Sequence, residues 1–436
     1  MNQQVLETPI ELNNKKTING WAFFDWANSV YSLVISTAIF PIYFIASSPD
    51  LIKIFGVDYS NESVYSFVVS ASYLLVAFLS PFLSGIADAG GKRMRFLKFF
   101  TIIGAIGCSA LFFYKDATLL WLGIIGFTLG TIGYAGSLVF YNSYLPQIAS
   151  EDQFDKVSAK GYAYGYIGSV ILLLIILVMV MKPDWFGLPD STTGSRIGFL
   201  LTGIWWLGFA QITFRRMPKD NKTPLEPGVV KKGFIELKVT FKKVMKDVNV
   251  RRFLLSFLFF SAGVNTIIYV ASIFASEEIG FNQTELIVLI LILQLVAVIG
   301  AYFFAYVSKK QGNKFGLAIQ IIIWLLLCIA AYFVTTKTGF YILVALVGMV
   351  LGGVQSLARS SYTKLLQDDV DDLTSFYSFY DVLYKISIVG GTFLYGMVFH
   401  ITKDLRYSVL ALAALFLIGF LVLMGVNFGA KGSKQD

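Results

Sequence analysis

Residues 161–181 read GYAYGYIGSVILLLIILVMVM, a run with no charged side chain. At a rise of about 1.5 Å per residue, a helix of this length covers about 30 Å, which is the thickness of the hydrocarbon core of a membrane. Comparable runs predict membrane spans at residues 20–46, 63–87, 96–114, 119–142, 160–181, 197–214, 252–275, 284–307, 315–335, 339–358, 374–399 and 406–428. We therefore expect an all-α polytopic membrane protein with twelve transmembrane helices.

The composition of the 436-residue chain argues against several classes of protein. Only 14% of its residues are charged, whereas soluble domains have about 25%, so a water-soluble enzyme is not expected. Two cysteines, Cys108 and Cys328, and a single histidine, His400, cannot build a disulfide scaffold or a multi-histidine metal centre. No glycine cluster joins a strand to a helix, as nucleotide-binding motifs require. We expect no cofactor, no metal and no nucleic-acid partner.

Lysine and arginine are distributed unevenly between the loops. The loops after odd-numbered spans contain only Lys53, Lys115, Lys182, Arg196, Lys337, Lys403 and Arg406. The termini and the other loops hold the rest of the 35 basic residues, apart from Lys385 within a span. Because basic loops remain in the cytoplasm, we expect both termini to be cytoplasmic.

The stretch 215–251 divides the predicted spans into two groups of six. In it, Phe234, Leu237, Phe241, Val244, Met245 and Val248 recur at helical spacing, with lysines on the other faces. This pattern predicts an amphipathic helix on the membrane surface; the alternative is a solvated basic linker that only sets the topology. The expected organisation is a cytoplasmic segment 1–19, bundles at 20–214 and 252–428 around this linker, and a tail at 429–436.

Four ionisable side chains stand out: Asp25, Asp381 and Lys385 lie inside predicted spans, and Arg359 lies at the end of one. Each costs about 2.5–3.5 kcal/mol at the centre of a bilayer, so such groups usually face a protein-lined cavity or a partner. Arg359 could bind a carboxylate in a bidentate fork, extend to the interface, or make a gate contact. The pair Asp381 and Lys385 is spaced for an ion pair within one helix. It either permits insertion by self-neutralisation or exchanges partners during transport.

Asp25, Asn28 and Ser29 follow a spacing that places them on one helical face. That face could line a solute path, with Asp25 as a proton or cation site. The alternative is an acid that only hydrogen-bonds to neighbouring helices. The other polar candidates for the path are Tyr141, Asn142, Asn265, Gln355 and Tyr377.

The segment SGIADAGGKR at 84–93 resembles the loop signature of the major facilitator superfamily. That signature has glycine, three residues, aspartate, two residues, glycine and two basic residues. Ser84 replaces the first glycine here, and a poorer copy at 305–314, AYVSKKQGNK, has Lys309 in place of the aspartate.

Three further segments narrow the resemblance: GWAFFDWANS at 20–29, FYNSYLP at 140–146 and GGVQSLARS at 352–360. They are similar to the bacterial "unknown major facilitator" permeases, which are related to fungal vacuolar amino-acid effluxers linked to autophagy. The similarity covers nearly the whole chain and implies small-solute transport in a bacterial inner membrane. The resemblance implies an aspartate just before the position of Gly263 in many relatives, but here the residue is Ala262, so no ion role is carried over to that position.

The resemblance also implies a cytoplasmic gate formed by Asp88, Gly91, Lys92 and Arg93. The helix expected to begin near Thr374 has unpaired backbone N–H groups, which give its start a partial positive charge. We expect Asp88 to approach this helix end when the cytoplasmic side is closed. The alternative is a loop acid that pairs only with the adjacent basic residues.

These observations favour a secondary transporter that acts as a monomer and exposes a central cavity alternately to the two sides. Amino acids are the leading substrate class, because of the family resemblance, and sugars or organic acids are alternatives. Proton coupling is a hypothesis that rests on the acids within the membrane. A membrane-embedded lipid enzyme would need a convergent catalytic constellation, and a transport-inactive receptor would normally carry a soluble domain; the sequence favours neither.

Overall fold

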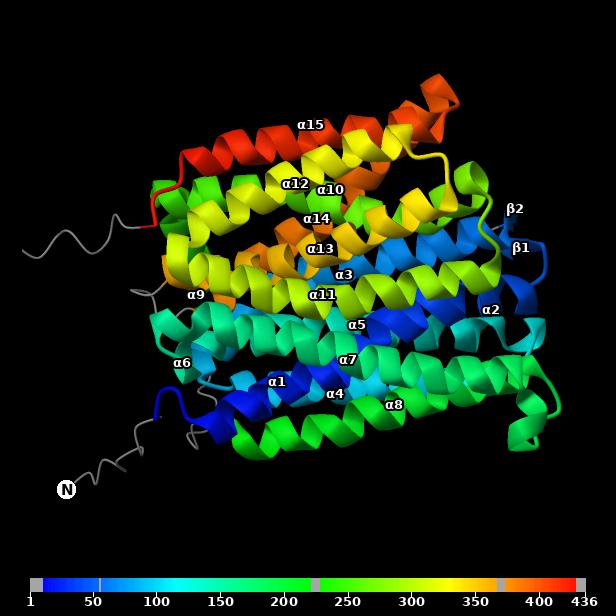
Figure 1. The fold of residues 1–436 in the computed structure, drawn as a ribbon. Coiled ribbons are helices and arrows are strands. Elements are labelled where there is room, and N and C mark those ends of the chain that lie inside the picture. The colour runs from blue at the N-terminus through cyan, green and yellow to red at the C-terminus, as the bar shows by residue number, and fades with distance from the viewer. Residues whose placement is uncertain (1–10, 55, 221–227, 367–372, 429–436) are drawn as a thin grey trace, which may run out of the picture.

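The computed structural model describes residues 11–54, 56–220, 228–366 and 373–428. Within these ranges, 12 helices are long and apolar enough to cross a membrane. The predicted all-α membrane fold is therefore confirmed (Figure 1). The predicted segment 1–19 is described only from residue 11 onward, and the predicted tail 429–436 lies outside the described residues, as do residues 221–227 of the predicted linker.

The first span is built from α1 (Lys15–Val30), the π-helical segment η1 (Tyr31–Ile39) and α2 (Phe40–Ser47). The other spans of the first half are α3 (Asn61–Gly90), α4 (Arg93–Ala110), α5 (Leu120–Asn142), α7 (Phe154–Met181) and α8 (Ser191–Arg216). The spans of the second half are α10 (Val248–Ile279), α11 (Gln283–Gln311), α12 (Asn313–Phe333), α13 (Lys337–Leu365), α14 (Leu373–Thr402) and α15 (Leu405–Met424). The short helix α6 (Leu145–Ile148) links α5 to α7.

Several helices extend beyond the apolar runs that predict them. The helix α10 begins at Val248, ahead of the predicted start at residue 252. The carboxylate of Asp247 caps it by accepting hydrogen bonds from the backbone N–H groups of Asn249 and Val250 at 2.8 and 3.0 Å. A capping residue satisfies backbone N–H donors at the start of a helix, and a hydropathy pattern does not detect it.

Two local features of the first half are absent from the sequence prediction. The segment η1 widens the helix where Pro41, at the start of α2, cannot donate a backbone hydrogen bond. The loop that follows forms a hairpin of β1 (Leu51–Ile54) and β2 (Val57–Ser60), paired antiparallel with Leu51 opposite Ser60. The all-α prediction therefore misses one small sheet.

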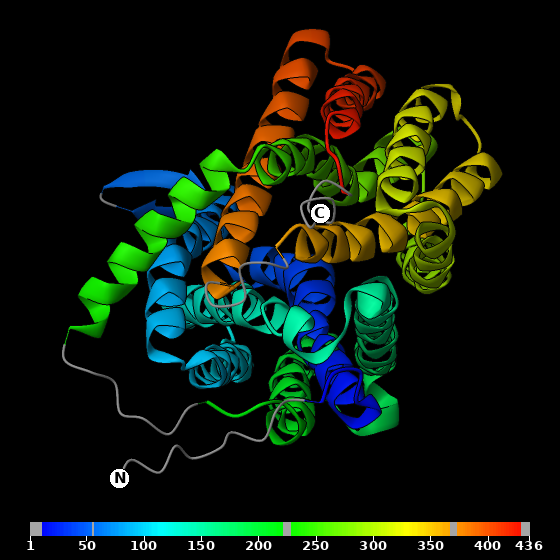
Figure 2. The ribbon, with the colours of Figure 1, turned by 90° about the vertical axis from the view of Figure 1, so that its left-hand side faces the viewer.

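The helices α1 and α15 begin and end, respectively, at the same end of the bundle, which we call the terminal face (Figure 1). Seen from that face, the two six-helix bundles lie side by side (Figure 2). They meet where α3 contacts α14 and where α7 contacts α11 and α13. Small residues allow close packing within each half: a Cβ atom on Gly352 of α13 would lie 1.9 Å from the carbonyl oxygen of Ala297 in α11.

The stretch between the halves contains the helix α9 (Val229–Lys246), which crosses the edge of the terminal face (Figure 2). The backbones of α9 and α3 are in direct contact: a Cβ atom on Gly85 would lie 2.3 Å from the carbonyl oxygen of Gly233. Of the predicted apolar stripe, Val244 is buried, while Phe234 and Phe241 are about half exposed.

Candidate functional site

A cavity of about 250 Å³ lies between the two halves. Its walls come from α1, η1, α5 and α7 in the first half and from α10, α11, α13 and α14 in the second. The wall residues toward the terminal face include Asp25, Asn142 and Arg359, and the wall reaches Phe340 near the opposite end of α13. The segment of α13 between Phe340 and Arg359 is about 28 Å long at 1.5 Å per residue. The cavity is therefore deep and ends on a cluster of ionisable side chains near the terminal face.

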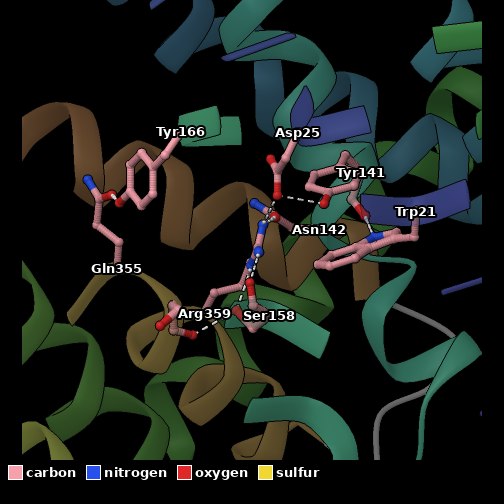
Figure 3. A network of polar contacts seen from close by, with 9 residues as sticks. Trp21, Asp25, Tyr141, Asn142, Ser158, Tyr166, Gln355 and Arg359 are labelled. Atoms are coloured by element: carbon pink, nitrogen blue, oxygen red, sulfur yellow. Dashed lines mark hydrogen bonds and ion pairs between the residues drawn. The ribbon is translucent and has the colours of Figure 1, made fainter. Parts of the chain in front are cut away.

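That cluster is built around Arg359 of α13, which reaches across the boundary between the halves (Figure 3). An Nη1 atom of Arg359 lies 3.2 Å from an Oδ2 atom of Asp25 in α1. The hydroxyl of Tyr141 in α5 donates a hydrogen bond to the same carboxylate oxygen at 2.7 Å. Only 2% of the Arg359 side chain and 6% of the Asp25 side chain are exposed. Arg359 therefore does not extend to the interface, which was one of the alternatives from the sequence.

Other groups of the first half complete the surroundings of the guanidinium. The Nε atom of Arg359 donates to the Ser158 hydroxyl at 2.9 Å, and Nη2 donates to the Ser158 carbonyl oxygen at 2.8 Å. The guanidinium carbon lies 4.3 and 4.6 Å from the ring centroids of Tyr162 and Trp21, within the range of cation–π attraction. The indole of Trp21 stacks on Tyr141 and donates to its carbonyl oxygen at 3.0 Å. One arginine of the second half is thus held by α1, α5 and α7.

The cluster has little spare room. A Cβ atom on Gly161 of α7 would lie 2.4 Å from the Asp25 carboxylate and 2.8 Å from the Arg359 guanidinium. Removing one partner of a buried ion pair costs about 3–5 kcal/mol, because the other charge stays buried without compensation. The arrangement therefore stabilises contact between the halves only while both charges are present.

Two hydrogen bonds lie along the cavity wall, farther from the terminal face than Arg359. The hydroxyl of Tyr166 in α7 donates to the Gln355 side chain in α13 at 2.5 Å, which is a second link between the halves. The hydroxyl of Tyr384 in α14 donates to Asn265 in α10 at 2.9 Å, within the second half. Both bonds present polar groups beside aromatic rings to the cavity.

A second charged pair lies on α14. The ammonium group of Lys385 contacts the carboxylate of Asp381 one turn earlier, as the spacing predicts. Asp381 lines the cavity, and the hydroxyl of Ser80 in α3 donates to it at 3.4 Å. The structure separates this pair from the first, because Arg359, rather than Lys385, is the partner of Asp25.

Asp88, at the end of α3, contacts the start of α14 across the boundary between the halves. Its Oδ2 atom accepts hydrogen bonds from the backbone N–H and the hydroxyl of Ser375 at 2.7 and 2.9 Å. Its Oδ1 atom pairs with Arg93 at 2.9 Å. Gly91 follows with a φ of 59°, a left-handed conformation that glycine adopts without strain, and ends the helix there. The neighbouring Lys92 is buried.

Asp155, in the first turn of α7, was not singled out from the sequence. Its carboxylate accepts hydrogen bonds from Ser308 at 2.9 Å and from Asn313 at 2.8 Å, and it pairs with Lys364 at 2.9 Å. These three partners belong to the second half, around the poorer copy of the loop signature. The missing acid of that loop is thus replaced by an acid on the facing helix. The sequence marks Asp155 only as an acid in the first turn of a helix, a position that also stabilises the helix itself.

Not all of the predicted path residues border the cavity. Asp25, Ser29, Asn142, Asn265, Gln355, Arg359 and Asp381 line it. Asn28 is fully buried beside this face, and its amide has no hydrogen-bond partner in the described part of the chain. Tyr377 is buried within the second half, where its hydroxyl contacts Thr363. Tyr141 and Lys385 are also buried, and each contacts a wall residue through the interactions above.

Comparison with known proteins is consistent with this geometry. The sequence profile described as "Vacuole effluxer Atg22 like" matches residues 13–435. The chain belongs to this family. A relative from Bacillus subtilis (strain 168), described as an uncharacterized MFS-type transporter, YxiO, is 30% identical over 94% of each chain. Autophagy-related protein 22 of Yarrowia lipolytica is 24% identical over 88% of this chain and 79% of its own length.

The fold of this Atg22-like protein also matches a solved transporter. The major facilitator superfamily protein FucP, in its outward conformation, superposes with a TM-score of 0.69 over 94% of this chain and 98% of its own, at 14% identity. The Atg22-like chain is therefore an integral membrane transporter of the major facilitator type.

Proposed function

We propose that this Atg22-like transporter carries a small zwitterionic solute of the amino-acid class by alternating access, coupled to protons. The observation that supports this most is the ion pair between Asp25 and Arg359, which joins the two halves at the end of the central cavity. A solute that reaches this pair meets a buried guanidinium. Asp381 on the same cavity wall, where it pairs with Lys385, supplies a carboxylate. A carboxylate and an ammonium group on one small molecule match these two sites.

The proposed coupling follows from the number of donors that Arg359 has already used. Its nitrogens are bonded to Asp25, Asn142 and Ser158, so a solute carboxylate must displace an acceptor. A proton on Asp25 removes that acceptor's charge and frees one edge of the guanidinium. The solute carboxylate then neutralises Arg359 while the link between the halves is broken. Charged fork contacts of this kind are strong and directional.

Two acids are the proposed gate at the terminal face. Asp88 links α3 to α14, and Asp155 links α7 to α11, α12 and α13. In the proposed cycle both links break when the halves rock apart at this face. We place the terminal face in the cytoplasm, because the basic loops lie at this end.

The experiment is transport by the purified chain in phosphatidylcholine vesicles. With an imposed proton gradient, the wild type should accumulate a labelled amino acid, and the panel should include a sugar and an organic acid. Asp25→Asn should still exchange solute across the membrane but lose gradient-driven accumulation. Asp184→Asn, which alters an exposed acid outside the spans, is the matched control and should behave as the wild type.

Each part of the proposal can fail separately. Transport of the sugar or the organic acid without transport of the amino acid would contradict the proposal that the substrate is a zwitterion. Equal accumulation by Asp25→Asn and the wild type would remove Asp25 from coupling. Accumulation that does not depend on the proton gradient would contradict coupling itself.

A further inference from the structure

The helix α9 has a buried side and an exposed side that differ in chemistry. Gly233, Thr240 and Val244 are buried against the bundle. Next to this side on the helical wheel lie Phe234, with 57% of its surface exposed, and Phe241, with 50%. Exposed phenylalanines on a helix beside a membrane-spanning bundle are typical of an amphipathic helix at the membrane boundary.

Lysines border the exposed apolar side. Lys231 and Lys238 are exposed and lie about two turns apart, each about one turn from Phe234 along the helix. Together with Gly228 and Ile235, these three side chains line a shallow groove along the first half of α9. Two ammonium groups beside apolar side chains match a ligand with a negative head and an apolar body.

The groove's neighbours connect it to the boundary between the halves. The ring of Phe234 lies 5.5 Å from the ring of Phe82 in α3. Farther along α9, the ring of Phe241 lies 5.8 Å from the ring of Phe379 in α14. The helix α9 therefore bridges the same two helices that Asp88 joins, and it does so while the contact between Asp88 and Ser375 is made.

We propose that the groove on α9 binds the headgroup of an anionic phospholipid and that the bound lipid stabilises the closed terminal face. Lys231 and Lys238 flank the phosphate, and Phe234 and Ile235 contact the lipid below it. Basic residues at a membrane surface attract anionic lipids in this way, and apolar side chains of an amphipathic helix enter the boundary between headgroups and acyl chains. The proposal does not depend on which solute is carried.

The test is phosphatidylglycerol binding by the purified full-length chain, measured by native mass spectrometry against phosphatidylcholine. The wild type should retain phosphatidylglycerol preferentially. Lys231→Gln/Lys238→Gln should bind it roughly thirtyfold more weakly, the factor expected when two lysines near the surface lose their attraction to an anionic lipid. Lys309→Gln/Lys310→Gln removes two exposed lysines from the end of α11 and should leave the affinity unchanged.

A second measurement follows the closed state. In phosphatidylcholine nanodiscs, added phosphatidylglycerol should increase the closed population, measured as the distance between labels at the ends of α4 and α11. This response should be absent in Lys231→Gln/Lys238→Gln.

Four results would overturn the proposal. If both double lysine substitutions weakened phosphatidylglycerol binding equally, the binding would reflect only the general attraction of basic residues to anionic lipid. If the chain retained phosphatidylglycerol and phosphatidylcholine equally, the groove would not select the headgroup. If inorganic phosphate displaced the lipid, the groove would be a site for a free anion. A doubled mass without bound lipid would assign the exposed side to a second copy of the chain.

Discussion

The substitution Asp88→Asn removes the negative charge from the contact between α3 and α14 while keeping the size of the side chain. In the wild type the carboxylate accepts two hydrogen bonds from Ser375, at 2.7 and 2.9 Å, and pairs with Arg93. Hydrogen bonds to a charged group contribute about 1.5–3 kcal/mol, and those between neutral groups contribute about 0.5–1.5 kcal/mol. Losing the charge should therefore weaken the contact by about 1–2 kcal/mol.

A loss of this size should raise the ratio of open to closed terminal faces roughly 5- to 30-fold. The favourable position of an anion at a helix start, worth up to about 2 kcal/mol in partly buried geometry, acts in the same direction. Solute affinity should change little, because Asp88 does not line the cavity.

The assay is pulsed electron resonance between spin labels at Lys98→Cys in α4 and Lys310→Cys in α11, both exposed positions. The matched control is Asp220→Asn. Asp220, in the linker, accepts from the backbone N–H groups of Met94 and Arg95 at 2.7 and 2.8 Å, and both of these partners belong to the first half. The reasoning is refuted if Asp88→Asn leaves the distance distribution unchanged, or if Asp220→Asn alters it equally.

Three further changes test the packing and the charges. Lys385→Ala leaves Asp381 buried without its cation and should lower the free energy of unfolding by about 3–5 kcal/mol. The double change to Ala at both positions should be less damaging than either single change in chemical unfolding, and additive losses would contradict pairing. Gly352→Ala puts a methyl carbon 1.9 Å from the backbone of α11 and should cost about 1–3 kcal/mol. Gly390→Ala, with no atom within 4 Å, should not lower the melting temperature. Asp155→Asn should raise the open population in the label assay, and an unchanged distance would exclude it from the gate.

The spans were predictable because apolar runs are local properties of a sequence. Capping by Asp247 makes α10 longer than its apolar run, and the π-helical segment before Pro41 changes the geometry of the first span. Neither feature changes the hydropathy of the sequence, so neither was predicted. The loop signature also pointed to the contact between Asp88 and the start of α14, because a helix start attracts an acid wherever the chain brings the two together.

The partner of Asp25 was not predictable from spacing. Asp25 and Arg359 lie in different halves. Helical periodicity shows which residues share a face of one helix, but it does not show which distant helix packs against that face. The same limit explains Asn28, which shares a helical face with Asp25 but is fully buried and does not line the cavity. Asp155 was missed because a first-turn acid also stabilises its own helix, so its contact with the other half adds no sequence pattern.

The central claim is that the Asp25–Arg359 pair holds the terminal face closed and that protonation of Asp25 releases it. The most direct measurement is the distance between the labels at positions 98 and 310 as a function of pH, in the wild type and in Asp25→Asn. The wild type should show the short distance at neutral pH and gain a longer distance on acidification. Asp25→Asn should show a larger share of the longer distance than the wild type at neutral pH, and this share should change little with pH. A variant that keeps the short distance throughout would contradict the claim.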